Sequence, residues 1–376
     1  MEAFHQILQS KAQYETVDAE APLVLYGAGD LGRMAMDYCK HLGLNVAAVV
    51  DRNPEPQTHD NILPDIDLLL PEQVDPKLKN DALIAICVAT CPYEPIKKQL
   101  LDEGWKNIIP FYDLAEAYRD KHPLGNGWYA PPFTDKDISK IHQVMSSWDD
   151  ERSKAYYLQF LAWRRLREEW VFEDAPVIAQ NRFFIPEVLS VLHEKESFLD
   201  VGAHTGKVIE RFLEILNFRF EHIVAIEPDE SSFPELLKNI ESFDPTVSSR
   251  IEALPIAVGE KTAMKGFYHG LGYASQFSDL SASVIPVHAI DDVYVTPSFI
   301  KIHIEGFELD ALKGAFNTLQ HYRPVLVVTS YHNSQGIWEL PLWMMDNLPD
   351  YKFLMRLHSW CGTGAVIYAI PHERRP

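Results

Sequence analysis

The chain has 376 residues, of which 47% are hydrophobic and 23% are charged, as in globular proteins that bury cores of their own. Its net charge of -20 argues against a nucleic-acid partner, which would require a basic face, and no segment is apolar enough to predict a membrane span or a secretory signal. The four scattered cysteines form neither a zinc-binding nor a disulfide pattern, so we expect a reduced, cytoplasmic protein.

The first region, residues 1–120, alternates short apolar strands with helices. Strands are expected at residues 23–26, 46–50, 83–88 and 108–109, with helices up to His41 and over residues 95–103. Alternation at this spacing is typical of right-handed βαβ units on a parallel sheet. We therefore predict an N-terminal Rossmann-like domain.

The second region, residues 121–196, has a different composition. It begins with a loop rich in Gly, Pro and aromatic residues at 123–132, and a long helical pattern follows at 149–169. We interpret the region as a linker and a helical connector.

The third region, residues 197–376, returns to alternating strands and helices. Strands are expected at residues 197–201, 222–226, 251–258, 299–304 and 325–329, and a closing hairpin at 352–357 and 365–369. Ser231 and Pro234 favour a helix start between the second and third of these strands. The whole chain is therefore predicted to be α/β, with a seven-stranded sheet in this last domain.

A glycine-rich loop follows the first predicted strand. Gly27, Gly29 and Gly32 have the spacing that lets a pyrophosphate approach a helix N-terminus. Asp51 ends the next strand, where a carboxylate can accept hydrogen bonds from ribose hydroxyls. These residues predict a site for a nucleotide, such as NAD or a nucleotide-sugar. The alternative is a domain of this shape that packs without binding a ligand.

A second, acid-first loop follows the strand at residues 197–201. It lacks the three-glycine spacing, which favours a ligand without phosphates. A carboxylate on the strand can favour an ammonium group, small residues let the backbone approach the ligand, and an acid at the end of the next strand can accept both ribose hydroxyls. We predict that this loop binds S-adenosylmethionine through Asp200, Gly202, Ala203, His204, Gly206 and Glu227.

The chain resembles the FkbM family of methyltransferases over roughly residues 149–371. The segments FLDVGAHTG at 198–206, AIEP at 225–228 and IKIHIEGFE at 300–308 carry the resemblance. It implies a class I methyltransferase sheet in the C-terminal domain and O-methylation, often of a sugar or another hydroxylated product. One position departs from the pattern, because the family usually has an aspartate where this chain has His303.

Four side chains near the ends of the later strands are candidates for the chemistry. A hydroxyl is a poor nucleophile, so a base that removes its proton accelerates methyl transfer. Period-2 geometry predicts His303 and Glu305 on one side of their strand, and His332 and His358 end the next two strands. We favour His303 or His332 as the general base, with Glu305 orienting it, and we predict no metal. A His/Glu/His metal site is the alternative.

These patterns together predict an S-adenosylmethionine-dependent O-methyltransferase. The acceptor would be a small molecule or a saccharide, and the Rossmann-like domain would bind its nucleotide end. Homo-oligomers are possible, with the helix at 149–169 as a candidate subunit contact. Two alternatives remain: a nucleotide- or NAD-binding protein whose second domain is degenerate, and a non-catalytic scaffold.

Overall fold

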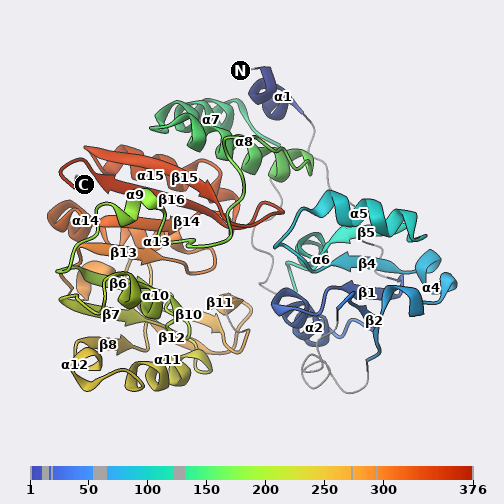
Figure 1. Cartoon of the computed structure of the whole chain (residues 1–376), viewed down its shortest axis with the longest axis horizontal. Helices are drawn as coiled ribbons and strands as arrows, with labels where there is room; N and C mark the ends of the chain where they lie inside the picture. Colours follow the sequence, from blue (N-terminus) through green and yellow to red (C-terminus); the bar gives the residue numbers. More distant parts are fainter. Residues whose placement is uncertain are drawn as a thin grey trace. The chain divides into compact units, whose positions relative to one another are not determined.

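The computed structural model describes residues 2–10, 17, 20–53, 66–121, 132–271, 274–293 and 295–374 (Figure 1). The chain forms two compact units. Unit 1 contains residues 1–132, 158–171 and 359–363, and unit 2 contains residues 133–157, 172–358 and 364–376. The predicted connector is thus divided between the two units. Most of the predicted Gly/Pro-rich loop, residues 123–131, lies outside the described residues.

Unit 1 contains the parallel sheet predicted from the sequence, with strand order β3-β2-β1-β4-β5. The inner strands β1 and β4 are fully buried apolar segments. Trp163 and Cys361, distant in sequence, pack into the same core. The elements are α1 (Glu2–Gln9), β1 (Leu23–Tyr26), α2 (Asp30–Leu42), β2 (Val46–Val50), β3 (Leu68–Leu69), η1 (Pro71–Gln73), α4 (Pro76–Asp81), β4 (Leu83–Ile86), α5 (Tyr93–Asp102), β5 (Asn107–Pro110) and α6 (Phe111–Ala117).

Unit 2 is built on a seven-stranded sheet of order β15-β16-β14-β13-β6-β7-β8, in which β16 pairs antiparallel with both neighbours. This confirms the predicted sheet with its closing hairpin. The strands are β6 (Ser197–Val201), β7 (His222–Ile226), β8 (Ile251–Leu254), β13 (Phe299–Ile302), β14 (Val325–Thr329), β15 (Tyr351–Leu357) and β16 (Ala365–Pro371). The helices are α7 (Asp135–Ser147), the start of α8 (Glu151–Leu166), α9 (Pro186–Leu189), α10 (Lys207–Ile215), α11 (Ser232–Glu241), α12 (Pro245–Ser248), α13 (Glu308–Lys313), α14 (Phe316–Tyr322) and α15 (Glu339–Asn347), with single turns η3 (Ile290–Asp292) and η4 (Ser334–Gly336).

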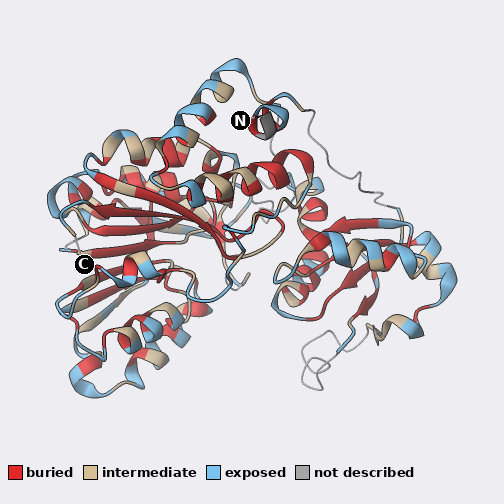
Figure 2. Cartoon of the chain, turned by 45° about the horizontal axis from the view of Figure 1, so that its top comes forward, coloured by how far each residue is buried: buried red, intermediate tan, exposed pale blue. Residues whose placement is uncertain are grey.

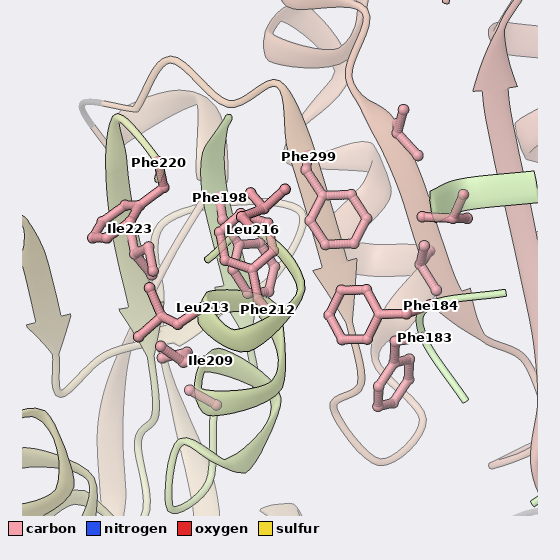
Figure 3. Packing of buried hydrophobic residues seen from close by; sticks show 14 of the residues in the cluster. Phe183, Phe184, Phe198, Ile209, Phe212, Leu213, Leu216, Phe220, Ile223 and Phe299 are labelled. Atoms are coloured by element: carbon pink, nitrogen blue, oxygen red, sulfur yellow. The ribbon is translucent and has the colours of Figure 1, made fainter. Parts of the chain in front are cut away.

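The core of unit 2 centres on phenylalanines that join α10 to the sheet. The Phe212 ring of α10 lies 4.7 Å from that of Phe198 on β6 and 5.9 Å from that of Phe299 on β13, measured between centroids (Figure 3). All three side chains are buried, and in Figure 2 the sheet strands are red while the outer helix faces are pale blue. Burying a phenylalanine contributes about 2–3 kcal/mol, so this contact fixes α10, and the loop before it, on the sheet.

Two predicted strands differ from those observed. The segment at 251–258 breaks at Pro255, and its second half, β9 (Ala257–Val258), joins a separate four-stranded sheet with β10 (Ala263–Tyr268), β11 (Gln276–Phe277) and β12 (Val284–His288). The strand predicted at 299–304 ends at Ile302, because Glu305 and Gly306 adopt positive φ values of 51° and 106°, which an extended strand excludes.

The outer edge of β15 is covered by the segment that leads into α8. The N–H of Asp149 donates to the carbonyl of Phe353 at 3.1 Å, and the Oγ of Ser153 accepts the N–H of Met355 at 2.9 Å. Nearby, the buried Arg356 guanidinium pairs with carboxylates at 2.9 and 2.6 Å, those of Asp150 and Glu187. Among the described helices, none is long and apolar enough to cross a membrane.

Candidate active site

A pocket in unit 2 lies where β6, β7 and β13 end. The strand order reverses between β6 and β13, and in open α/β sheets ligands bind at such a switch point, beyond the carboxyl ends of the strands. The small four-stranded sheet supplies another part of the wall. The lining residues are 201–205, 207–208, 226–228, 256–258, 267, 275–277, 301 and 303–305.

The loop from β6 to α10 is tightly folded and tied to β7. Gly202, His204 and Gly206 all have positive φ values, of 77°, 49° and 87°. The N–H groups of Gly202 and Ala203 both donate to the carbonyl of Ile226, at 2.9 and 3.0 Å. A Cβ at Gly202 would lie 2.0 Å from the carbonyl oxygen of His303, so only glycine allows the ends of β6 and β13 to approach this closely.

Glu227 follows β7 and connects two backbone segments. Its Oε2 accepts the N–H of His204 at 2.7 Å, and its Oε1 accepts the N–H of Asp229 at 2.9 Å. The residue is only 7% exposed, and burial raises the pKa of its carboxyl group. Each carboxylate oxygen can accept more than one hydrogen bond. Glu227 therefore retains acceptor capacity toward the pocket that it lines.

Asp200 lies one step back from the pocket. Its side chain is fully buried, and Oδ1 lies 2.8 Å from Nζ of Lys301 on β13. That Nζ also donates to the carbonyl of Gly202 at 2.6 Å. Lys301 lines the pocket and Asp200 does not. The position of Asp200 therefore does not favour the predicted contact with a cofactor. The Asp200–Lys301 pair instead fixes the Gly202 loop. Gly206 also lies outside the lining and begins α10.

Three of the four predicted catalytic side chains converge in the turn after β13. Nε2 of His303 and Nε2 of His332 each lie 3.3 Å from Oε1 of Glu305. Their rings are stacked with centroids 5.1 Å apart. Neither His303 nor Glu305 is on the strand, so the period-2 argument for their common side is wrong. The positive φ at Glu305 turns its side chain back toward His303.

A second carboxylate, that of Glu308, lies behind this cluster. Its Oε1 is 2.6 Å from Nδ1 of His332 and accepts the hydroxyl of Thr329 at 3.0 Å. The N–H groups of Ile304 and Gly306 donate to the two oxygens at 3.1 and 3.0 Å. Glu308 thus fixes both the turn that carries Glu305 and the ring of His332.

Burial and neighbouring charges separate the protonation states of the two histidines. Burial, with the charges of Arg182 and His332, lowers the pKa of His303 to about 3. Burial also acts on His332, but Glu305 and Glu308 overcome it and raise its pKa well above the ordinary value. Although burial would raise the pKa of Glu305, the charge of His332 holds it below its usual range. The neutral imidazole, that of His303, is also the one that faces the pocket.

His358 is not part of this cluster. Its Nδ1 is 2.6 Å from the carbonyl oxygen of Ile178, and its Nε2 is 2.7 Å from the hydroxyl of Tyr368. Both ring nitrogens are therefore occupied, and the residue does not line the pocket. The geometry favours a structural role, fixing the chain around Ile178 to the end of β15.

Sequence reasoning missed Asp229, which fixes the segment containing Gly270 and Ser275. Asp229 accepts the N–H of Gly270 at 2.8 Å and the hydroxyl of Ser275 at 2.7 Å, and it also accepts the N–H groups of Ser231 and Ser232 at 3.0 and 2.9 Å. Ser275, in a segment rich in Gly and Ser, lines the pocket. Positions 272 and 273 of that loop lie outside the described residues.

The glycine loop of unit 1 has a closely related geometry. Oδ2 of Asp51 accepts the N–H of Ala28 at 2.7 Å, and Oδ1 accepts the N–H of Asn53 at 2.8 Å. A Cβ at Gly32 would lie 2.0 Å from the carbonyl oxygen of Gly27, whereas one at Gly29 would meet nothing within 4 Å. Packing therefore explains Gly32 but not Gly29.

Part of unit 2 matches a known family, and the fold of the chain matches a solved structure. Residues 200–355 match the model of the methyltransferase FkbM domain. The crystal structure of methyltransferase FkbM from Methylobacillus flagellatus KT is similar over 98% of this chain and 93% of that chain, with a TM-score of 0.65 and 20% identity, which indicates a shared fold. More distant is a SAM dependent methyltransferase from Aquifex aeolicus, with 12% identity and a TM-score of 0.31 over 50% of this chain and 88% of that chain. Precorrin-6y C5,15-methyltransferase from Geobacter metallireducens GS-15 has 14% identity and a TM-score of 0.32 over 53% of this chain and 95% of that chain. No curated protein sequence matches the chain.

Proposed function

The chain carries a methyltransferase FkbM domain at residues 200–355, and from this premise we propose that it is an S-adenosylmethionine-dependent O-methyltransferase. The acceptor that we propose is a hydroxyl group of a sugar, a nucleotide-linked sugar or a related natural product. The observation that carries the proposal is the coincidence of the family match with a pocket whose wall joins the Gly202 loop and Glu227 to the His303 and Glu305 cluster.

The donor side of the pocket has residues suited to a nucleoside without phosphates. Glu227 offers carboxylate lone pairs to the two ribose hydroxyls, and the loop at 202–205 presents backbone close to the ligand. Ile256, Val258 and Phe267 supply apolar wall, as a flat purine base requires. Two cations line the pocket, Lys301, whose charge Asp200 offsets, and the exposed Lys207 at the start of α10.

The acceptor side of the pocket is formed by His303 and Glu305. S-adenosylmethionine supplies the activated methyl group, and the protein has to orient the hydroxyl, exclude water and remove its proton. His303 is the histidine that faces the pocket, whereas His332 is 1% exposed. Nε2 of His303 is therefore the atom that we place against the hydroxyl proton, with Glu305 beside it at 3.3 Å.

Isothermal titration with S-adenosylmethionine tests the donor site through Glu227→Gln. Losing charge-assisted hydrogen bonds to the ribose costs about 1.5–3 kcal/mol, so we expect affinity to fall about 10- to 100-fold. Asp51→Asn is a matched control, because Asp51 makes the same two kinds of backbone bond in unit 1. We expect it to leave S-adenosylmethionine affinity unchanged.

Other results would contradict the proposal. If the unaltered protein binds NAD or a UDP-sugar tightly but not S-adenosylmethionine, the chain is a nucleotide-binding protein with a degenerate second domain. If the cofactor binds equally to the Glu227→Gln variant, Glu227 is not its ribose acceptor.

A further inference from the structure

The side chains of His303, Glu305 and His332 converge on one point beside the pocket. One donor atom from each, two imidazole nitrogens and a carboxylate oxygen, lie within 4.8 Å of one another. Two of the three separations are 3.3 Å. Ligands at bond lengths of about 2.0–2.2 Å around one ion are themselves roughly 3.0–3.5 Å apart. The two separations to Glu305 therefore match ligands of a shared cation, and the third lies within 4.8 Å.

His332 has the environment of a metal-binding histidine. It is 1% exposed, and its Nδ1 lies 2.6 Å from Oε1 of Glu308. Its other nitrogen, Nε2, is buried and has no hydrogen-bond partner, although Oε1 of Glu305 is 3.3 Å away. Metal-binding imidazoles almost always donate their second N–H to a carboxylate or a carbonyl, which orients the ring. Glu308 is suited to accept the Nδ1–H of His332 in this way. Nε2 of His332 lies near Glu305 but makes no hydrogen bond to it.

We propose that His303, Glu305 and His332 bind a divalent first-row transition-metal ion such as Zn²⁺, Co²⁺, Mn²⁺ or Fe²⁺. Two imidazoles and one carboxylate favour these ions over Mg²⁺ and Ca²⁺, which prefer oxygen ligands. Three protein ligands leave coordination positions open. The open positions face the pocket, because His303 and Glu305 line it while His332 lies behind them.

A role for the ion in catalysis rests on the proposed methyltransferase function. The acceptor hydroxyl would take an open position, where the ion lowers its pKa and the proton leaves to water. The ion would offset the negative charge of the deprotonated acceptor oxygen. The C–S bond of S-adenosylmethionine would then break as the new C–O bond forms. Nε2 of His303 would in this case be a ligand and not the proton acceptor. The hydroxyl of Tyr331 lies 3.1 Å from that nitrogen.

Metal binding can be measured independently of methyl transfer. Untagged full-length protein would be stripped with a chelator and titrated with Zn²⁺ by calorimetry and with Co²⁺ by visible absorption, without S-adenosylmethionine. We expect one saturable metal site per chain. Glu305→Gln and His332→Ala should each lower the metal affinity at least 10-fold, because the loss of outer-shell partners alone has an effect of that size. His321→Ala removes an exposed histidine outside the cluster and should bind as the unaltered protein does.

Folding and selectivity provide further checks. Zn²⁺ at a concentration of about ten times the Kd of the unaltered protein should raise the Tm of that protein clearly more than the Tm of Glu305→Gln. Each variant's own melting transition shows whether it folds. His303→Asp exchanges an imidazole for an oxygen ligand, so affinity should shift from Zn²⁺ toward Mn²⁺. The proposal is overturned if the unaltered protein has no one-to-one site, or if both single variants bind as tightly as it does. Cofactor titration without metal tests the proposed function separately.

Discussion

Gly202 combines a left-handed backbone conformation with a backbone clash for any side chain. Its φ is 77°, and a Cβ would lie 2.0 Å from the carbonyl oxygen of His303, a backbone atom that cannot move aside. The left-handed conformation alone costs about 1–2 kcal/mol, and the clash adds to it. We expect Gly202→Ala to lower the free energy of unfolding by about 3 kcal/mol or more in urea titrations, with Gly29→Ala as the control that changes it little. Equal losses in the two variants would contradict this account.

At the level of residues, the sequence predicts acids at strand ends better than it predicts their partners. Glu227 and Gly202 were predicted from spacing, and both line the pocket. Lys301 was part of a segment interpreted as an apolar strand. Its partner Asp200 lies about a hundred residues earlier, and the two meet only because β13 and β6 pair in that register. Glu308 was missed as a partner of His332 for the same reason, since a 2.6 Å contact between a helix start and a strand end has no local signature.

Asp229 connects two elements, the start of α11 and the loop that leads to β11. Burial alone would raise its pKa, but hydrogen bonds from Ser231, Gly270 and Ser275 lower it to about 2. The ionised form is therefore favoured in the folded state. Its contribution to stability is complete above the ordinary aspartate pKa of about 4 and is lost as the pH falls toward 2.

We accordingly expect Asp229→Asn to destabilise the protein by about 1–2 kcal/mol at neutral pH. The difference from the unaltered protein should shrink between about pH 4 and pH 2, as measured by denaturant titrations at a series of pH values. Asp279→Asn, a change at an exposed position of the neighbouring segment, is the control. A difference that stays constant down to pH 2 would show that the hydrogen bonds do not require the ionised carboxylate.

Regular elements were predictable where burial is complete. The strands at 197–201, 222–226 and 325–329 were predicted with their observed bounds, because in each at least four consecutive residues, most of them apolar, are buried in a parallel core. The small sheet of β9 to β12 was not predicted. Its longest strand, β10, has one fully buried residue, Phe267, and otherwise exposed or half-buried ones, so the sequence lacks a periodic signal.

At the scale of the whole chain, the two units use one carboxylate arrangement twice. In each unit, the acid after the second strand accepts one N–H from a residue 23 positions earlier and one from the residue two positions later. For Asp51 the donors are Ala28 and Asn53. For Glu227 they are His204 and Asp229. The bonds of Asp51 therefore need no ligand to explain them, because they shape the loop. Gly29 is the position in the Gly27 loop that packing leaves unexplained.

The ligand of unit 1 can be tested at that position. If a nucleotide approaches the Gly27 loop, Gly29→Ala should abolish binding of NAD or a UDP-sugar in calorimetric titrations, because a methyl group prevents close approach of a pyrophosphate. The same variant should retain the stability of the unaltered protein. Glu227→Gln should not affect this binding. If neither ligand binds the unaltered protein, unit 1 does not take up a nucleotide of these classes.

The covered edge of β15 limits how the protein can associate with itself. A strand at the rim of a sheet normally exposes N–H and C=O groups that another chain can extend, which leads to fibrous aggregates. Here the segment containing Asp149 and Ser153 already uses the N–H of Met355 and the carbonyl of Phe353. Growth of the seven-stranded sheet from copy to copy is thus restricted to its opposite rim, the four-residue strand β8. With one rim closed and the other short, a stable subunit contact is better made through side chains than through continuous backbone pairing.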